Sequence, residues 1–333
     1  MYKMKIKNIY KIFILTLLLL SINIINASSL PTSSLNYELE LIIKPENPTA
    51  NQTISAKANL YALDINKYEV LWFLDGKLIQ KGVGQTDFFF QTGNWGKETI
   101  LTAQVNTTND GIISKQIYIL PSEVDLIWEA KTYTPPFYKG KVLNSSNSII
   151  NVVAVPNLID KNGNKIPSDK LIYKWKEDWK VKGNQSGYGK NTFSFESPQI
   201  TRSKSITVEV ESLDNSLKTK KTINFRSNQT KIIFYKEDPL LGILYNQAIN
   251  SNYTLSDSEE EVTIKAYPFF FSPQNELKYK WEMNNKILNN IKNEIIFRKQ
   301  PNLTGSTQVS LKINNLDKIL QFTDNTFLIN FEE

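Results

Sequence analysis

Leu171-Ile-Tyr-Lys-Trp175 sets the architecture of the molecule, because two further copies of its pattern occur along the chain. These copies are Tyr68-Glu-Val-Leu-Trp72 and Leu277-Lys-Tyr-Lys-Trp281. In each copy apolar residues alternate and the pattern ends on the tryptophan, which indicates a strand with one buried face. The tryptophans are 103 and 106 residues apart, a spacing typical of whole domains rather than of short repeats. The pattern therefore predicts three domains built on one plan.

Further alternating segments surround each tryptophan strand in the same order. In the second copy they are Val124/Leu126/Trp128, Ile150/Val152/Ala154, Phe193/Phe195, Ile206/Val208/Val210 and Ile223/Phe225. Prolines after the opening strand and Asn-, Gly- and Ser-rich turns separate the segments, and no stretch after residue 27 has a helical period. We expect six or seven short strands per copy. The fold class is predicted to be all-β, with three tandem Ig-like antiparallel β-sandwich domains at 37–121, 122–227 and 228–333.

The tryptophan of each copy is expected to fill the core between the two sheets. Its bulk is best used there, and its indole N–H would find a hydrogen-bond partner.

The N-terminus has the pattern of a secretory signal peptide. Lys3, Lys5, Lys7 and Lys11 precede an apolar run over 12–25, and small residues follow it near Ala27. We expect a signal peptide at 1–27 and a linker at 28–36, with an uncleaved membrane anchor as the alternative. The chain is therefore predicted to be exported, secreted or at the cell surface, and to meet a membrane only through this segment if it is uncleaved.

Composition excludes several classes of function. The chain has no histidine and no cysteine, which removes Ser-His-Asp and Cys-His catalysis and zinc, copper or haem sites built on those ligands. Taking the four lysines of the leader from the 39 basic residues leaves 35 against 33 acidic ones, and the charges are interleaved. A nucleic-acid partner is not expected, because such proteins carry a dense basic stripe. The sequence predicts no enzyme and no catalytic, cofactor-binding or metal site.

Two short motifs resemble extracellular domains. Trp72-Phe-Leu-Asp-Gly76, followed by Thr92-Gly-Asn-Trp-Gly96 and an alternating strand over 100–105, resembles the polycystic-kidney-disease (PKD) type of Ig-like domain. The second and third copies depart from this pattern, since neither tryptophan is followed by an Asp-Gly turn. Asp160-Lys-Asn-Gly-Asn-Lys-Ile-Pro167 is similar to a turn of bacterial Ig-like adhesins. These resemblances imply modules used for spacing, adhesion, or protein and sugar contacts.

Two groups of oxygen-bearing side chains are candidates for a cation. Asp160, Asn162, Asn164 and Asp169 are rich in oxygen, but an EF-type loop needs glycine where Lys165 stands, so an Asn-Gly hairpin is favoured. The acidic cluster over 257–261 precedes a strand of the third copy. There a domain-interface cation is conceivable, but a solvated loop that protects the strand from mispairing is the simpler interpretation.

The aromatic residues outside the repeat are the candidates for a binding face. Alternation sends Phe89 or Phe270 outward if its flanking phenylalanines point inward. A neighbouring domain or loop could equally cover these rings. The remaining candidates are Trp95, Trp179, Tyr133, Phe137 and Tyr138.

The sequence thus predicts a non-enzymatic, modular exported protein for surface adhesion, spacing or protein interaction. The first alternative is an array of carbohydrate-binding modules, and the second is a subunit of a pilus or surface layer. The partner is expected to be a protein or glycan at the cell surface.

Overall fold

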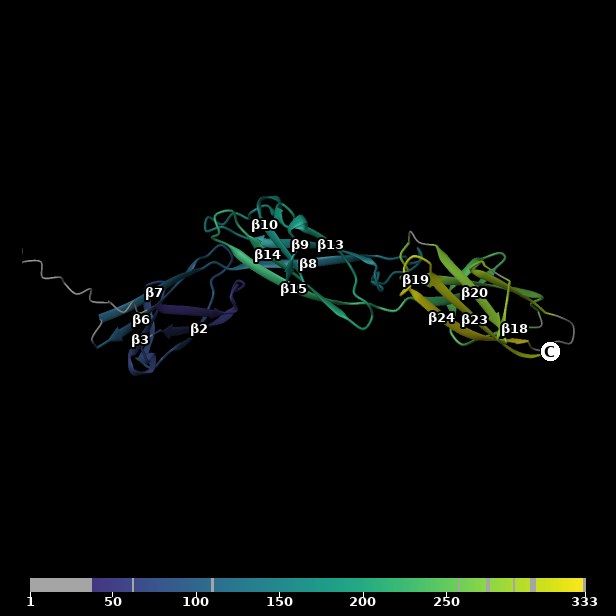
Figure 1. The fold of residues 1–333 in the computed structure, drawn as a ribbon, viewed down its shortest axis with the longest axis horizontal. Helices are drawn as coiled ribbons and strands as arrows, with labels where there is room; N and C mark the ends of the chain where they lie inside the picture. Colours follow the sequence, from purple (N-terminus) through teal and green to yellow (C-terminus); the bar gives the residue numbers. More distant parts are fainter. Residues whose placement is uncertain are drawn as a thin grey trace, which may run out of the picture.

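The computed structural model describes residues 38–331, except 62, 109–110, 257, 274–275, 290 and 300–303. The predicted signal peptide and the linker at 28–36 lie outside this part of the chain. Three β-sandwiches follow one another in a row, and the last strand of the third ends the described chain at the far end (Figure 1).

The first sandwich consists of a three-stranded and a four-stranded sheet. Strands β1 (Leu39–Lys44), β2 (Thr53–Leu60) and β5 (Asp87–Gln91) form one sheet in the order β1-β2-β5. The other sheet has the order β4-β3-β6-β7, with β3 at Glu69–Leu74, β4 at Lys77–Val83, β6 at Thr99–Thr107 and β7 at Gly111–Ile119. All pairs are antiparallel, and the inward residues of both sheets form one core. A short 3₁₀ turn, Ile65–Lys67, leads into β3.

The second sandwich repeats this arrangement. One sheet has the order β13-β9-β8, with β8 at Ser122–Lys131, β9 at Ile149–Leu158 and β13 at Thr192–Glu196. The facing sheet has the order β11-β10-β14-β15, with β10 at Ile172–Glu177, β14 at Ser203–Glu211 and β15 at Lys218–Arg226. Two-residue strands β11 (Lys180–Val181) and β12 (Gly187–Tyr188) both pair with β10. Short 3₁₀ turns lie at Ser168–Lys170 and Gly183–Gln185.

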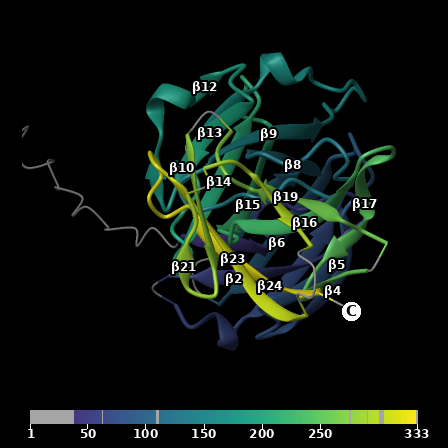
Figure 2. The same ribbon diagram turned by 90° about the vertical axis from the view of Figure 1, so that its right-hand side faces the viewer.

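The third sandwich has more strands than the shared plan predicts. Its first sheet is β17-β16-β19-β22, with β16 at Lys231–Asp238, β17 at Gly242–Ile249, β19 at Glu261–Phe269 and β22 at Glu294–Arg298. Its second sheet is β18-β24-β23-β20-β21, with β18 at Asn252–Leu255, β20 at Leu277–Met283, β21 at Lys286–Ile287, β23 at Gly305–Asn315 and β24 at Phe322–Phe331. β18 pairs in parallel with β24, whereas the other pairs are antiparallel. The β16–β17 hairpin stands at the side of this sandwich when the row is viewed from its end (Figure 2).

The three repeated tryptophans lie at the centres of the cores, as the sequence predicts. Trp72, Trp175 and Trp281 are fully buried. Each indole N–H donates to a backbone carbonyl oxygen, at 2.8 Å for Gln85, 2.9 Å for Lys190 and 2.9 Å for Lys292. The expectation of a buried indole with a hydrogen-bond partner is therefore confirmed in all three copies.

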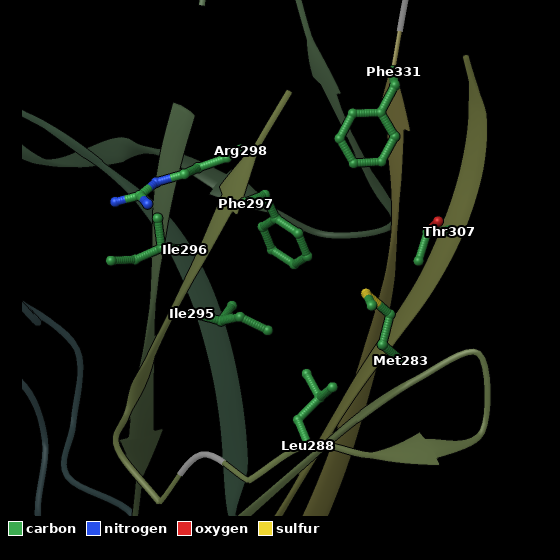
Figure 3. Close-up of a pocket in the computed structure, with 8 residues that line it drawn as sticks. All are labelled: Met283, Leu288, Ile295, Ile296, Phe297, Arg298, Thr307 and Phe331. Carbon is green, nitrogen blue, oxygen red and sulfur yellow. The ribbon is translucent and has the colours of Figure 1, made fainter. Parts of the chain in front are cut away.

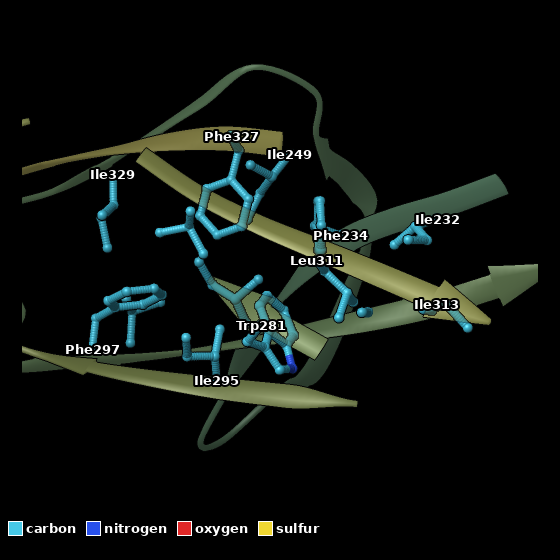
Figure 4. Packing of buried hydrophobic residues seen from close by; sticks show 14 of the residues in the cluster. Ile232, Phe234, Ile249, Trp281, Ile295, Phe297, Leu311, Ile313, Phe327 and Ile329 are labelled. Carbon is cyan, nitrogen blue, oxygen red and sulfur yellow. The ribbon is translucent and has the colours of Figure 1, made fainter. Parts of the chain in front are cut away.

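The rings around the tryptophan differ between the copies. Trp72 stacks on Phe88, and Trp175 stacks on Phe193, both with ring centres 5.3 Å apart. In the third core Ile295 stands in the place of these phenylalanines, and Phe234 from β16 packs against Trp281 instead, at 5.9 Å (Figure 4). The third domain thus fills the same space from a different strand.

All three copies follow the tryptophan strand with the same two-residue hairpin turn. Asp75-Gly76, Asp178-Trp179 and Asn284-Asn285 each have positive φ at both positions, and the flanking residues pair directly. This is the signature of a type I′ turn, which matches the twist of the strands that it joins. The second and third copies therefore form the turn without the Asp-Gly sequence. Trp179 adopts a φ of 73° at the position where the first copy has glycine.

The first and second sandwiches meet through a loop and a hairpin. Gly96 has a φ of 72°, and a side-chain carbon there would lie 3.0 Å from the carbonyl oxygen of Asp160. In addition, the backbone N–H of Ser122 donates to the carbonyl oxygen of Pro48 at 3.1 Å. The positive φ and this close approach both favour glycine, so the Gly96 motif of the first copy serves the contact with the second.

We predict that replacing any repeated tryptophan by alanine will cost about 3–5 kcal/mol, because it opens a cavity and leaves a buried carbonyl oxygen without its donor. Urea unfolding of Trp72→Ala, Trp175→Ala and Trp281→Ala should show one destabilised transition each. Trp179→Ala is the matched control and should change the free energy of unfolding by no more than about 0.5 kcal/mol, since the ring is exposed. Trp95 is half-buried and outside the repeat, so Trp95→Ala should also cost much less. Equal costs at all five positions would contradict the assignment.

Candidate functional site

The candidate site lies where the second sandwich meets the third. Between β8 and β9 the chain over 132–148 leaves the second sandwich and contacts the third. The backbone N–H of Tyr133 donates to the carbonyl oxygen of Phe271 at 2.7 Å, and the N–H of Phe270 donates to the carbonyl oxygen of Tyr133, also at 2.7 Å. Tyr133 thus faces two consecutive residues, and Phe270 has a φ of 66°, which is the hydrogen-bond pattern of a β-bulge of the G1 type. The junction is therefore bonded through the backbone.

A buried glutamine holds the same junction together. Gln321 is fully buried, and its Nε2 donates to the carbonyl oxygen of Ser146 at 2.8 Å and to Oγ of Ser272 at 2.9 Å. Its Oε1 accepts hydrogen bonds from the N–H of Ser272 and from Nδ2 of Asn315, both at 2.9 Å. All four hydrogen-bonding positions of the amide are used. Removing this side chain would leave buried polar groups of both domains unpaired.

A second polar group closes the other side of the junction. Asn144 is buried, and its Nδ2 donates to Oγ of Ser197 at 2.6 Å, while its carbonyl oxygen accepts from the N–H of Asn228 at 2.9 Å. Lys318 of the third sandwich forms an ion pair with Glu196 of the second at 3.0 Å. These contacts join the two domains on several sides, so the pair forms a continuous unit.

Four aromatic rings pack together at this junction. Phe137, from the 132–148 segment, stacks on Tyr245 of β17 with ring centres 3.8 Å apart. It also meets Tyr235 of β16 and Tyr267 of β19 edge-on, at 5.5 Å and 5.4 Å. Tyr138 lies edge-on to Phe269 and Phe270. The segment thus places its rings on an aromatic face that the third domain supplies.

Beside these rings lies a groove of about 490 Å³. Its lining combines aromatic and aliphatic side chains with two lysines and includes no acidic residue. The lining residues are Phe137, Tyr138, Lys139, Leu143, Lys231, Ile233, Tyr235, Tyr245, Phe269 and Phe270. Lys139 and Lys231 are exposed, and neither forms an ion pair with another described residue. The groove is therefore an apolar channel with uncompensated positive charge.

Tyr235 is the unusual residue of the groove. Its side chain is 6% exposed, yet its hydroxyl has no hydrogen-bond partner among the residues that the structure describes. Burial raises its pKa, and the neighbouring Tyr245 raises it further. By contrast, the Tyr267 hydroxyl lies 3.3 Å from that of Tyr245. The ring is covered but the hydroxyl oxygen keeps some exposure to solvent, since among the described residues Ser145 Oγ is the buried side-chain oxygen without a partner, so the Tyr235 hydroxyl is a donor available to a ligand in the groove.

The structure corrects one expectation about the phenylalanine runs. Phe269, Phe270 and Phe271 are all buried. Phe270 does not point outward, because β19 ends at Phe269 and Phe270 takes a φ of 66°, which breaks the alternation. It is then covered by Tyr138 and the 132–148 segment. The alternative of cover by a neighbouring domain therefore holds for this run.

The other predicted aromatic residues have different surroundings. In the first run Phe89 is 69% exposed between two buried phenylalanines, as alternation predicts. Trp179 is 92% exposed at the tip of its hairpin. Trp95 is half-buried in the loop next to the second sandwich, so it does not join the groove. Of the set, Phe137 and Tyr138 line the groove, and Tyr133 provides its backbone hydrogen bonds.

The oxygen-rich turn at Asp160 forms the expected hairpin. Oδ1 of Asp160 accepts hydrogen bonds from the backbone N–H groups of Asn162 and Asn164, at 2.9 Å and 2.8 Å, and these donors lower its pKa. Gly163 has a φ of 84°. Asp169 lies apart in the 3₁₀ turn Ser168–Lys170. The carboxylate is thus occupied by its own turn.

In the acidic loop, Asp257 lies outside the described residues. Glu259 pairs with Lys236 and accepts a hydrogen bond from Tyr253, and Glu261 pairs with Arg298 at 2.8 Å. Across the described part of the chain, no three acidic side chains gather in a way that could hold a metal ion. Within the same residues, no helix is long and apolar enough to span a bilayer.

A second groove, of about 620 Å³, lies between the sheets at the far end of the third sandwich (Figure 3). Met283, Leu288, Ile295, Phe297 and Phe331 point into it. Residues 300–303, which follow β22 in the sequence, lie outside the described part of the chain.

No model of a known protein family matches the chain, and no curated protein is similar to it in sequence. Among solved structures it is similar to the three N-terminal domains of the bacteriophage RB49 highly immunogenic outer capsid protein, with 11% identity over 89% of this chain and 100% of that one, at a TM-score of 0.25. It is also similar to the central fibronectin-III array of RIM-binding protein, with 10% identity over 87% and 95%, at 0.30.

A third similar structure is the Bacteroides ovatus protein SGBP-B of a mixed-linkage glucan utilization locus, in complex with a heptasaccharide. Its identity is 11% over 88% of this chain and 70% of that one, at a TM-score of 0.21. With overall scores this low, none of these likenesses carries an argument about function. The class that the fold itself defines is a tandem array of Ig-like β-sandwich domains.

Replacing the buried glutamine should loosen the junction. Gln321→Ala removes four hydrogen bonds and leaves buried groups unpaired, each at a cost of about 1–3 kcal/mol. We expect faster amide hydrogen exchange at Ser272 and at the Tyr133–Phe271 contact, with the first sandwich unaffected. Gln116→Ala, on the exposed face of β7, is the matched control. Unchanged exchange at the junction would show that the amide does not hold it.

Raising the pH should weaken the same junction. Burial raises the pKa of Tyr267, and its hydrogen bond with Tyr245 raises it further. A raised folded pKa means that the neutral phenol is favoured in the folded state. The stability that the neutral phenol contributes is complete below the pKa of an unfolded tyrosine, about 10, and is lost as the pH rises above that value. Urea unfolding from pH 8 to 11 should show this loss in the third domain, and Tyr267→Phe should reduce it. An identical slope in both proteins would contradict the assignment.

Proposed function

We propose that the protein is an exported, non-enzymatic interaction module, a row of three sandwiches that spaces and presents a contact surface to a partner at the cell surface. The observation that carries the proposal is the groove between the second and third domains. Backbone hydrogen bonds and a fully satisfied buried amide fix its two walls. A site whose walls are fixed in advance loses little entropy when it binds. Export itself is proposed from the pattern of the N-terminal segment.

The two alternatives from the sequence have separate observations in their favour. A glycan partner is favoured by the exposed ring of Trp179, since aromatic faces stack on sugars. Assembly into a pilus or surface layer is favoured by β22, which lies at the edge of its sheet next to the groove of Figure 3. Kinship with PKD-type domains is proposed for the first sandwich alone, supported by its Asp75-Gly76 turn.

Binding to intact cells tests the proposed function. The labelled chain, beginning after residue 27, should bind saturably to cells of its own species. Pronase treatment of the cells should abolish binding to a protein partner, whereas periodate should abolish binding to a glycan. Trp179→Ala should reduce only the periodate-sensitive binding. Unsaturable binding, or none, would contradict an adhesive role, and concentration-dependent oligomers in scattering would favour assembly.

A further inference from the structure

We propose that the junction groove binds an extended segment of a partner protein in which a proline or aromatic residue lies beside an aspartate or glutamate. The inference rests on the proposed function, because it names the ligand of the same site. The three observations that carry it are the aromatic walls, the unpartnered hydroxyl of Tyr235 and the two unpaired lysines.

The chain itself shows how a proline-containing segment lies on these rings. Pro135 and Pro136 precede Phe137 in a turn that the N–H of Tyr138 closes by donating to the carbonyl oxygen of Pro135 at 2.9 Å, and the ring of Phe137 stacks on Tyr245. Prolines restrict the backbone, so a segment that contains them loses little entropy when it binds to an aromatic surface. The groove continues beside Phe137 and Tyr138 with the same kind of lining. Aromatic-lined grooves of this sort are a recurring way to bind proline-containing peptides.

The hydroxyl of Tyr235 supplies the polar contact that a peptide backbone needs. It has no partner among the described residues and reaches the groove, and burial of the side chain raises its pKa, so it is protonated and can donate at neutral pH. A peptide carbonyl oxygen is a strong acceptor that an extended segment repeats along its length. One such carbonyl would satisfy the hydroxyl and fix the position of the segment in the groove.

The charges of the groove select an acidic partner. Lys139 and Lys231 line it, and no carboxylate of the lining compensates them. A partner aspartate or glutamate would pair with either ammonium group, and the attraction would also speed the encounter. The positive charge therefore distinguishes an acidic peptide from a neutral or basic one.

The polar lining does not suit a sugar. Recognition of several hydroxyl groups needs both donors and acceptors, which asparagine, glutamine and carboxylate side chains supply. None of these residue types lines the groove. The lining instead matches apolar side chains with one acceptor and one negative charge.

Selection from a random peptide library tests the proposal on the full exported chain. A phage-displayed library of twelve-residue peptides is enriched on the wild type after depletion on Tyr245→Ala, which removes the ring that stacks on Phe137. We expect the enriched peptides to carry proline or an aromatic residue next to aspartate or glutamate. One synthetic peptide of the enriched sequence is then titrated against each variant.

The double variant Lys139→Glu/Lys231→Glu should weaken binding of that peptide at least tenfold and reverse its salt dependence, because added salt screens a repulsion in the variant and an attraction in the wild type. Tyr235→Phe, which removes only the hydroxyl, should weaken it several-fold. The control Lys97→Glu/Lys115→Glu makes the same change of charge on exposed residues of the first sandwich and should have no effect. Circular dichroism and urea unfolding check that each variant is folded; if Tyr245→Ala is not, depletion uses the charge-reversed double variant.

Enriched peptides without acidic residues, or equal affinity for the wild type and the double variant, would overturn the proposal. Binding of polygalacturonate to the wild type that is lost with Tyr245→Ala would overturn it in favour of an acidic glycan. The two proposals fail separately. Saturable binding to cells that the groove variants leave unchanged overturns only the groove ligand, whereas a groove-dependent peptide without binding to cells overturns only the adhesive role.

Discussion

The hydrogen bond from each buried indole to a backbone carbonyl oxygen holds the two sheets of every sandwich in place. The acceptors are Gln85, Lys190 and Lys292. Each lies two residues before the start of an edge strand of the opposite sheet, namely β5, β13 or β22. One side chain therefore fills the core and also fixes where the facing strand begins. The separation along the chain varies, at 13, 15 and 11 residues, so the loops absorb the differences while the bond is kept. The bond thus keeps the start of the facing strand in the same place relative to the tryptophan in all three domains.

The sequence could predict this part of the fold because its signal is local. In a strand buried on one face, apolar and polar residues alternate, and five residues are enough to show the alternation. Ile150, Val152 and Ala154 are an example. Two strands of the third domain were missed for the same reason. β17 is exposed along most of its length, and β18 has only four residues, so neither has a clear apolar period.

The candidate site was predictable only as a set of unassigned aromatic residues. The sequence points to Phe137 and Tyr138. It does not point to Tyr235, Tyr245 or Tyr267, because these three tyrosines have the pattern of ordinary strand residues. What brings the rings together is contact between domains about 100 residues apart, which no local pattern contains. Phe270 shows the limit most clearly. Its buried position follows from a positive φ and a neighbouring domain rather than from its own strand.

Aromatic residues therefore have two distinct roles in this chain. Those of the repeat are satisfied within one domain: the indoles have their carbonyl partners and the phenylalanines their stacked neighbours. Those of the junction line a groove instead: Phe137 fills the space between the tyrosines, and the hydroxyl of Tyr235 stays accessible without a partner among the described residues. Phenylalanine at position 235 would pack the same ring but would offer the groove no donor. The hydroxyl is therefore available to a group outside the chain, whereas the indoles of the repeated cores already have their acceptors.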